Sequence, residues 1–224
     1  MITVNRKQQI EFWEKGQSKR KSPDHPVICA IVKPKLDLIK KYINLNSKSI
    51  LDVGSGNGYF AYYLSKYANV VGADISETLL KANPLSKKVK CDAQNLPFKK
   101  DSFDIVISSN LLHHVNNPKK VVSEMHRVSR KYVVLSDANR NNPFLFIYSL
   151  IKREERGALK ISKNYLNDML MDLNMHSMFC TTMGFIVPNL TPEPLLSMFK
   201  KMERPFVSIF GGIYSMVISK KAYK

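Results

Sequence analysis

The chain has 224 residues, of which 44% are hydrophobic and 10% aromatic, and its formal net charge at pH 7 is +17. This composition is typical of a folded globular protein and excludes a disordered chain. The length fits one domain with a sizeable core. No apolar stretch reaches the ~20 residues that a bilayer-spanning helix needs, and the polar start is unlike a signal peptide. We therefore expect a soluble, cytoplasmic protein, with peripheral contact with a membrane left open.

The positive charge is spread along the chain and suits nucleic acid, an anionic membrane surface or an acidic substrate. A solvated lysine-rich surface is the favoured explanation, because no arginine-rich block and no interleaved basic and aromatic pattern occurs. The three cysteines, Cys29, Cys91 and Cys180, are far apart and odd in number. They indicate neither a disulfide framework nor a zinc site, so no metal site is predicted.

In chain order, the first predicted element is a basic amphipathic helix over residues 4–20, with Val4, Ile10, Phe12 and Trp13 as apolar anchors. A second helix is expected over residues 28–43, with Pro34 as either a kink or the true start. Strands and helices then alternate, which predicts a parallel sheet covered on both faces. The predicted strands are residues 49–53, 70–74, 88–91, 103–108 and 132–135, and the helices between them are residues 59–67, 76–82 and 117–128.

The last third of the chain has a different pattern. Its predicted elements are helices over residues 144–152 and 162–173, a strand over 179–187 interrupted by Gly184, a helix from Thr191-Pro192 and a strand over 213–219. We therefore divide the one expected domain into three parts. Residues 1–45 form an N-terminal helical extension, residues 46–140 form the core, and residues 141–224 supply inserted cap helices and the last part of the sheet.

A glycine-rich loop is the sharpest motif in the sequence. It is Asp52-Val53-Gly54-Ser55-Gly56-Asn57-Gly58, between the first strand and its helix. The third glycine is four positions after the first, whereas a dinucleotide fingerprint has it five positions on. The Asp52 carboxylate opposes a pyrophosphate and favours a cationic ligand such as S-adenosylmethionine (SAM). An ordinary strand-to-helix turn is the alternative.

Acidic residues also end the next two predicted strands. Asp74, 22 residues after Asp52, can accept both ribose hydroxyls of an adenosyl group, or it simply caps the helix near Ser76. Asp92 can accept a hydrogen bond from an adenine amino group, or it is a turn residue without a ligand. The strand over residues 103–108 is expected to end beside the methionine moiety of the donor.

Together these motifs resemble the class I SAM-dependent methyltransferase family over about residues 45–140. Within it they are similar to small-molecule enzymes of ubiquinone and menaquinone biosynthesis, which carry a Phe-Asp-x-Val strand followed by Leu-His-His. The resemblance implies a Rossmann-like α/β fold with seven strands in the order 3-2-1-4-5-7-6, the seventh antiparallel, and a helical cap. It implies SAM as cofactor. The implied SAM-binding residues are Asp52, Gly54, Ser55, Gly56, Asn57 and Gly58 at the methionine end, Asp74 and Ile75 at the ribose, Asp92 and Ala93 at the adenine, and Ser108 or Asn110 near the sulfonium.

His113 and His114 are the candidate catalytic residues, because an adjacent histidine pair can titrate near neutral pH and take the proton of a methyl acceptor. A histidine that only packs or caps is the favoured alternative, since methyl transfer works largely by proximity. Arg140 follows the fifth strand and either meets an acidic acceptor or is solvated. The apolar residues 143–148 either bind a lipid-like acceptor or belong to the core.

The leading functional hypothesis is therefore methyl transfer to a small-molecule or lipid-like acceptor. An RNA methyltransferase is the alternative that the charge supports, but Ser108-Ser109-Asn110-Leu111 replaces the Pro-Pro motif of enzymes that methylate adenine or glutamine nitrogen. A SAM-binding protein without catalysis is a third reading. An NAD-dependent dehydrogenase is the weakest, because of the glycine spacing and Asp52.

Overall fold

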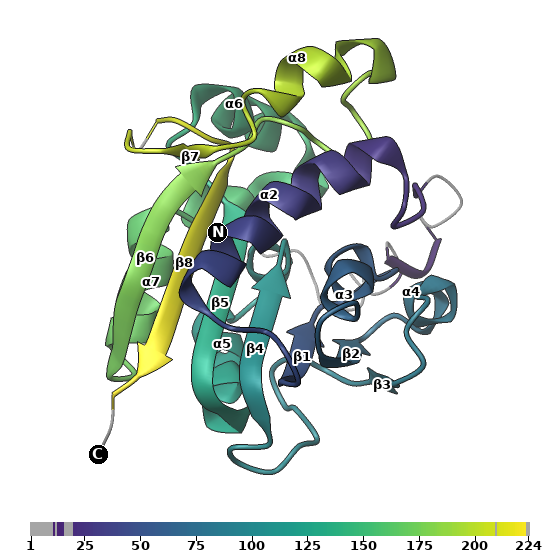
Figure 1. Ribbon diagram of the computed structural model, residues 1–224. Coiled ribbons are helices and arrows are strands. Elements are labelled where there is room, and N and C mark those ends of the chain that lie inside the picture. Colours follow the sequence, from purple (N-terminus) through teal and green to yellow (C-terminus); the bar gives the residue numbers. More distant parts are fainter. Residues whose placement is uncertain (1–10, 12, 16–19, 209, 223–224) are drawn as a thin grey trace.

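Eight strands form one mixed sheet in the part of the chain that the computed structural model describes, residues 11, 13–15, 20–208 and 210–222 (Figure 1). The strand order is β3-β2-β1-β4-β5-β8-β6-β7. The first five strands in the chain are parallel, and β8 runs antiparallel to both of its neighbours, β5 and β6. This arrangement contains the predicted order 3-2-1-4-5-7-6, with β8 as the seventh strand of that order, and it confirms the fold class.

The alternating half of the chain matches its prediction closely. Its strands are β1 (Ser49–Val53), β2 (Asn69–Asp74), β3 (Lys88–Lys90), β4 (Phe103–Ser109) and β5 (Ser129–Ala138), and its helices are α3 (Tyr59–Leu64), α4 (Glu77–Ala82), the 3-10 helix η2 (Leu112–His114) and α5 (Pro118–Val128). The predicted helix starts are confirmed. The Ser76 hydroxyl accepts from Leu79 N–H at 3.2 Å, and Asn117 Oδ1 accepts from Lys120 N–H at 3.1 Å.

The last third contains one strand that the sequence did not predict. Its elements are α6 (Pro143–Ile151), the 3-10 helix η3 (Arg153–Lys160), α7 (Lys163–Met171), β6 (Met175–Met183), the 3-10 helix η4 (Glu193–Leu195), α8 (Leu196–Lys200), β7 (Pro205–Phe206) and β8 (Tyr214–Lys221). The two-residue β7 pairs with the end of β6 and makes an eighth, edge strand. Strand β6 ends before Gly184, at φ 72°, because Glu203 Oε1 accepts from Phe185 and Ile186 N–H.

Helix α2 (Pro26–Tyr42) begins earlier than predicted. His25 Nδ1 accepts from Val27 N–H at 3.2 Å at its start, and Pro34 lies inside the helix and does not mark its beginning. Most of the helix predicted over residues 4–20, with Val4, Ile10 and Phe12, lies outside the described residues. Trp13 to Lys15 are helical.

Two apolar clusters pack on opposite faces of the sheet. Helices α2 and α3 pack on one face with Ile50 of β1, and α5 and α7 pack on the other with its neighbour Leu51 (Figure 1). This follows from the strand geometry, since successive side chains point to opposite faces. Among the helices of the described residues, none is both long and apolar enough to cross a membrane. The helices cover the two faces of the sheet, and a ligand site is therefore expected at the carboxyl ends of the parallel strands.

Candidate active site

A cavity of about 960 Å³ lies where the parallel strands end. Its walls come from the glycine loop after β1, the residues that follow β2, β3, β4 and β5, and parts of α2, α6 and the segment before β8. In an open α/β sheet this edge is where ligands bind. The predicted site residues that line the cavity are Asp52, Gly54, Ser55, Gly56, Asn57, Asp74, Ile75, Asp92, Ala93, Asn110, His113 and His114.

The glycine loop reaches the cavity in a backbone conformation that L side chains rarely adopt. Gly54 has φ 73° and Gly56 has φ 49°. A Cβ on Gly54 would lie 2.9 Å from Leu111 Cδ1, so the loop and the segment after β4 touch here. Gly58 is not among the lining residues. It precedes α3 at φ 89°, and a Cβ there would lie 2.7 Å from Asn83 Oδ1.

The Asp74 carboxylate joins the glycine loop to the segment after β2. Its Oδ2 accepts from Gly56 N–H at 2.8 Å and its Oδ1 accepts from Ser76 N–H at 2.9 Å. The helix cap itself is Ser76, so Asp74 is more than a cap. Burial raises its pKa, although these N–H donors and Arg20 oppose the shift. Each oxygen of the Asp74 carboxylate can accept a second hydrogen bond, so the pair could accept from the two hydroxyls of a ribose.

The buried carboxylate of Asp52 is the feature of the cavity that most clearly indicates a cationic ligand. The residue is 2% exposed, and its Oδ2 has no hydrogen-bond partner among the described residues. Burial, with the negative charge of Asp74, raises the pKa of the Asp52 carboxyl to about 7. A buried carboxylate oxygen without a donor is costly, and a cationic ligand in the cavity would supply the missing partner. SAM carries an ammonium and a sulfonium, so the residues present fit it.

Two predicted contacts lie elsewhere. Ser108 is buried inside β4 and is not among the residues that line the cavity, whereas its neighbour Ser109 is. The alternation of a strand explains this, because adjacent side chains point to opposite faces. Arg140 is exposed and does not line the cavity either, so the solvated alternative holds for it.

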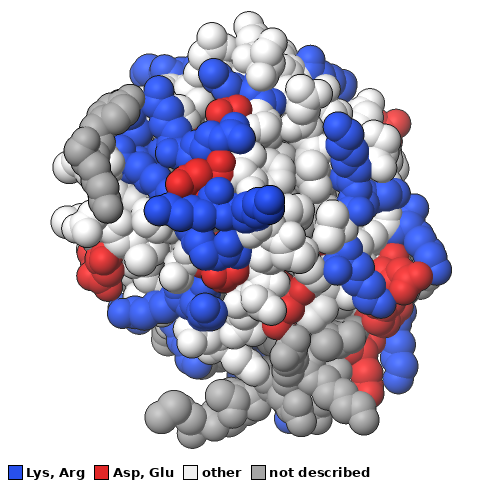
Figure 2. Space-filling view, turned by 90° about the horizontal axis from the view of Figure 1, so that it is seen from below, with Lys and Arg blue, Asp and Glu red and all other residues white. Residues whose placement is uncertain are grey.

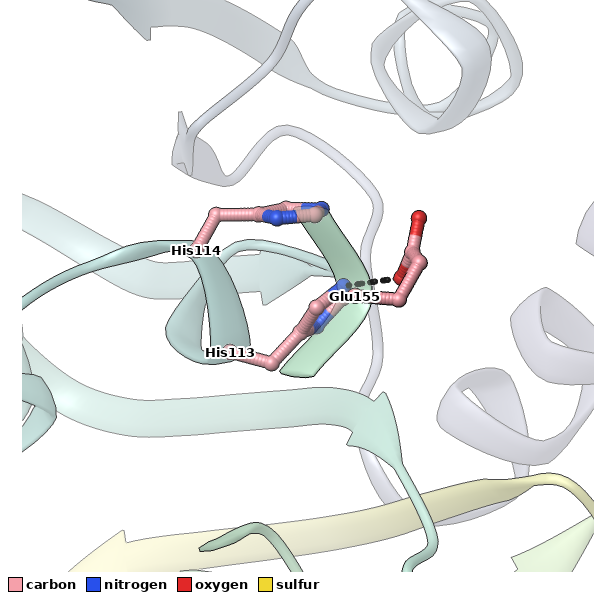
Figure 3. A group of neighbouring side chains, drawn as sticks. All are labelled: His113, His114 and Glu155. Atoms are coloured by element: carbon pink, nitrogen blue, oxygen red, sulfur yellow. Dashed lines mark ion pairs between the residues drawn. The ribbon is translucent and has the colours of Figure 1, made fainter. Parts of the chain in front are cut away.

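Both histidines line the cavity, and Figure 3 shows them beside Glu155. His113 Nδ1 lies 2.5 Å from Asp137 Oδ1, and its Nε2 lies 3.4 Å from Glu155 Oε2. Burial lowers the pKa of His113, but these two carboxylates outweigh it and raise the value to about 10. Burial and the charges of His113 and Arg20 hold the pKa of His114 well below its usual value. The two carboxylates therefore favour the protonated form of His113, whereas His114 is held neutral and is only a weak base.

The sequence analysis did not single out the lining residues Arg20, Lys35 and Glu155, nor Asp137, which contacts the lining residue His113. Asp137 had a detectable signal, an acid at the end of the fifth strand, and it also accepts from Leu112 N–H at 2.7 Å. Lys35 lies in a helix whose stripe is otherwise apolar, and Glu155 lies in a segment without a motif. Only the fold brings these residues to the cavity.

Lys35 is 1% exposed, and its Nζ lies 3.6 Å from the centre of the Tyr214 ring. Burial lowers its pKa to about 8, although Glu203 and Asp137 act in the other direction. Among the described residues, no carboxylate forms an ion pair with it. Lys35 is thus a buried cation in the cavity wall that faces an aromatic ring and has no ion-pair partner among the described residues.

Sequence comparisons agree with this geometry. The methyltransferase domain family matches residues 51–135. An uncharacterized protein of Methanocaldococcus jannaschii is 29% identical over 174 residues, which make up 75% of this chain and 73% of that protein. A ubiquinone biosynthesis O-methyltransferase of Dechloromonas aromatica is 32% identical over 132 residues, 54% of this chain. The match spans 56% of that relative's length.

A solved structure has the same fold. It is a SAM-dependent methyltransferase from Thermotoga maritima, described as a possible histamine N-methyltransferase. The alignment covers 88% of this chain and 92% of the Thermotoga maritima chain, with a TM-score of 0.68 and 20% sequence identity. The domain match covers β1 to β5, and the sheet order and the loop carboxylates agree with it. Residues 51–135 thus match a methyltransferase domain, and the chain has the fold of SAM-dependent methyltransferases.

Proposed function

We propose that the protein transfers the methyl group of SAM to a small or lipid-like acceptor that is largely apolar and carries an acidic group. The observation that supports this most directly is the second half of the cavity, away from the glycine loop. The lining residues there are mainly apolar, and they include the buried Lys35. SAM at Asp52 and Asp74 leaves this half for the acceptor.

The apolar wall favours a hydrophobic acceptor. It is formed by Ile28, Ile31, Val32, Leu145, Phe185, Val187, Phe199 and Ile213. Each methylene that such a wall removes from water contributes about 0.8 kcal/mol. That corresponds to about a fourfold gain in affinity per carbon, so an acceptor series of increasing chain length would have a falling KM until the cavity is full.

Lys35 is better placed than Arg140 to contact an acidic group of the acceptor, because Lys35 lines the cavity and Arg140 does not. A buried ammonium without an anionic partner is unfavourable, and a carboxylate or phosphate on the acceptor would compensate it. Glu203 lies near enough to influence the pKa of Lys35 without forming an ion pair with it. An acidic group is therefore the polar feature that we expect on the acceptor.

The basic surface gives RNA less support than the net charge suggests. Lys and Arg side chains gather on the lower face of the molecule (Figure 2). That face includes the amino edge of the sheet, where Lys48 precedes β1 and Arg130 and Lys131 begin β5. The cavity lies at the opposite, carboxyl edge. An RNA that used these side chains for its phosphates would not place a base in the cavity without extending around the sheet.

The test is methyl transfer from labelled SAM to separate lipid, metabolite and RNA extracts. We expect the label in an acidic fraction that partitions into organic solvent, with turnover only weakly dependent on salt, because such an acceptor would contact few cations. Label in RNase-sensitive material, with turnover that falls steeply with salt, would overturn the proposal and favour an RNA methyltransferase.

Lys35→Met sharpens this test once an acceptor fraction is found. Loss of a hydrogen bond to a charged group costs ~1.5–3 kcal/mol, so KM for the acidic acceptor should rise about tenfold or more while SAM affinity stays unchanged. A neutral ester of the acceptor should respond little. Lys33→Met, at an exposed position of the same helix, is the matched control. An equal effect of both substitutions would contradict the role of Lys35.

A further inference from the structure

We propose that His113, His114 and Glu155 bind a divalent first-row transition metal ion in the wall of the cavity (Figure 3). The three side chains come from two segments, η2 and η3, that are about forty residues apart in the chain. One ligand atom from each residue lies within 4.8 Å of the other two. The proposal concerns an ion and does not depend on which acceptor the enzyme methylates.

The spacing of the best-defined pair fits a shared ion. His113 Nε2 and Glu155 Oε2 are 3.4 Å apart, which is long for a charged hydrogen bond. Zinc bonds to imidazole nitrogen and carboxylate oxygen are about 2.0–2.2 Å long. Two ligands of a tetrahedral ion with bonds of ~2.1 Å are therefore about 3.4 Å apart. His114 lies beside them, with its ring centre 3.8 Å from that of His113.

Each histidine ring has a hydrogen-bond partner outside the cluster, as metal-binding histidines generally do. His113 Nδ1 faces the Asp137 carboxylate at 2.5 Å, which leaves Nε2 toward the cluster. Asp137 is itself anchored by Leu112 and Ala138 N–H. The ring of His114 is bonded to the backbone of Glu154. The Asp137 contact fixes the ring of His113 without using Nε2, which binds the ion after losing its proton.

A glycine permits the close approach of the two segments. A Cβ on Gly157 would lie 1.7 Å from the carbonyl oxygen of His113, so no other residue fits there without moving η3. This contact between η3 and the backbone of His113 brings Glu155 to the two imidazole rings. The arrangement is therefore set by backbone packing and not by a chance meeting of flexible side chains.

The donor set indicates the kind of ion. Two imidazole nitrogens and one carboxylate oxygen suit zinc, cobalt or iron(II), whereas magnesium prefers oxygen ligands alone. Three protein ligands leave a position open, and all three residues line the cavity. An oxygen of the acceptor or a water molecule can take that position. Arg20 is the opposing charge, since it interacts with both Glu155 and His114, and it should make binding weaker than in a closed structural site.

Cobalt provides a direct readout, because its visible absorption reports the ligand geometry. Titration of the metal-free, full-length protein with Co²⁺ should give one saturable visible band per chain, and Zn²⁺ should abolish the band by competition. Mg²⁺ should not. Metal content after purification without chelators is a second measurement.

Glu155→Gln in η3 should weaken Co²⁺ binding at least tenfold and shift the visible band. His114→Ala in η2 should have the same two effects. Glu154→Gln is the matched control, because it changes an adjacent acid whose side chain is not a proposed ligand. SAM binding by each variant checks that the fold is intact. Absence of a band above that of free Co²⁺, or equal Co²⁺ affinity of the wild type and Glu155→Gln, would overturn the metal site. Neither result would contradict the proposed methyl transfer, which is tested separately.

Discussion

Asp52→Asn is the substitution that most directly tests how the cofactor is held. We expect the cation of SAM to require the ionised carboxylate, because its buried Oδ2 has no donor among the described residues. The pKa of Asp52 is raised to about 7 by burial and by Asp74. Acidification protonates Asp52 and removes the charge that attracts SAM, so the affinity should fall as the pH decreases through 7.

The magnitude follows from the pKa. If only the ionised form binds, the apparent dissociation constant is multiplied by 1 + 10 raised to the power (7 − pH), using the pKa of about 7. Between pH 7.5 and pH 5.5 this factor grows by about 25-fold. The α-amino group of SAM stays mostly protonated over this range, because the pKa of an α-amino group is ordinarily about 7.7–8.0. The amide introduced by Asp52→Asn cannot titrate, so the variant should bind weakly and with the same affinity at both pH values.

Calorimetry at constant ionic strength, with SAM and with its demethylated product, gives these constants. The product keeps the ammonium and lacks the sulfonium, so a matching pH profile identifies the ammonium as the partner of Asp52. Asp74 and Arg20 also act on this part of the cavity. Asp74→Asn should therefore lower the pKa of Asp52 and move the profile to lower pH. A pH-independent wild type, or the same slope in Asp52→Asn, would refute the reasoning.

Two further predictions concern stability and the cavity roof. Gly58→Ala should reduce the free energy of unfolding by ~1–3 kcal/mol in chemical denaturation, because residue 58 has φ 89° and its Cβ would meet Asn83; an unchanged midpoint would contradict this. Deletion of residues 1–15 should spare folding and SAM binding but impair turnover, since Trp13 lines the cavity and packs on His114, with ring centres 4.7 Å apart. Full turnover would exclude a roofing role for this segment.

The sequence alone was sufficient for the core of the fold and for locating the two carboxylates, Asp52 and Asp74, that line the cavity beside the glycine loop. The strand bounds 49–53 and the caps Ser76 and Asn117 agree with the structure, because period, glycine and capping signals are local. Asp52 and Asp74 could be located for the same reason. In a parallel sheet, residues that follow successive strands meet at one edge, so their chain positions determine their place in space.

The acceptor half depended on tertiary structure. Lys35 looks like an interruption of an apolar stripe until α2 is packed over the sheet beside Tyr214. Glu155 reaches His113 across about forty residues, through a backbone contact at Gly157 that no periodicity indicates. Ser108 and Ser109 differ by one position, yet only Ser109 lines the cavity, because the pleat of β4 sends them to opposite faces. Such contacts depend on how distant segments pack, and a single sequence carries no local signal for that.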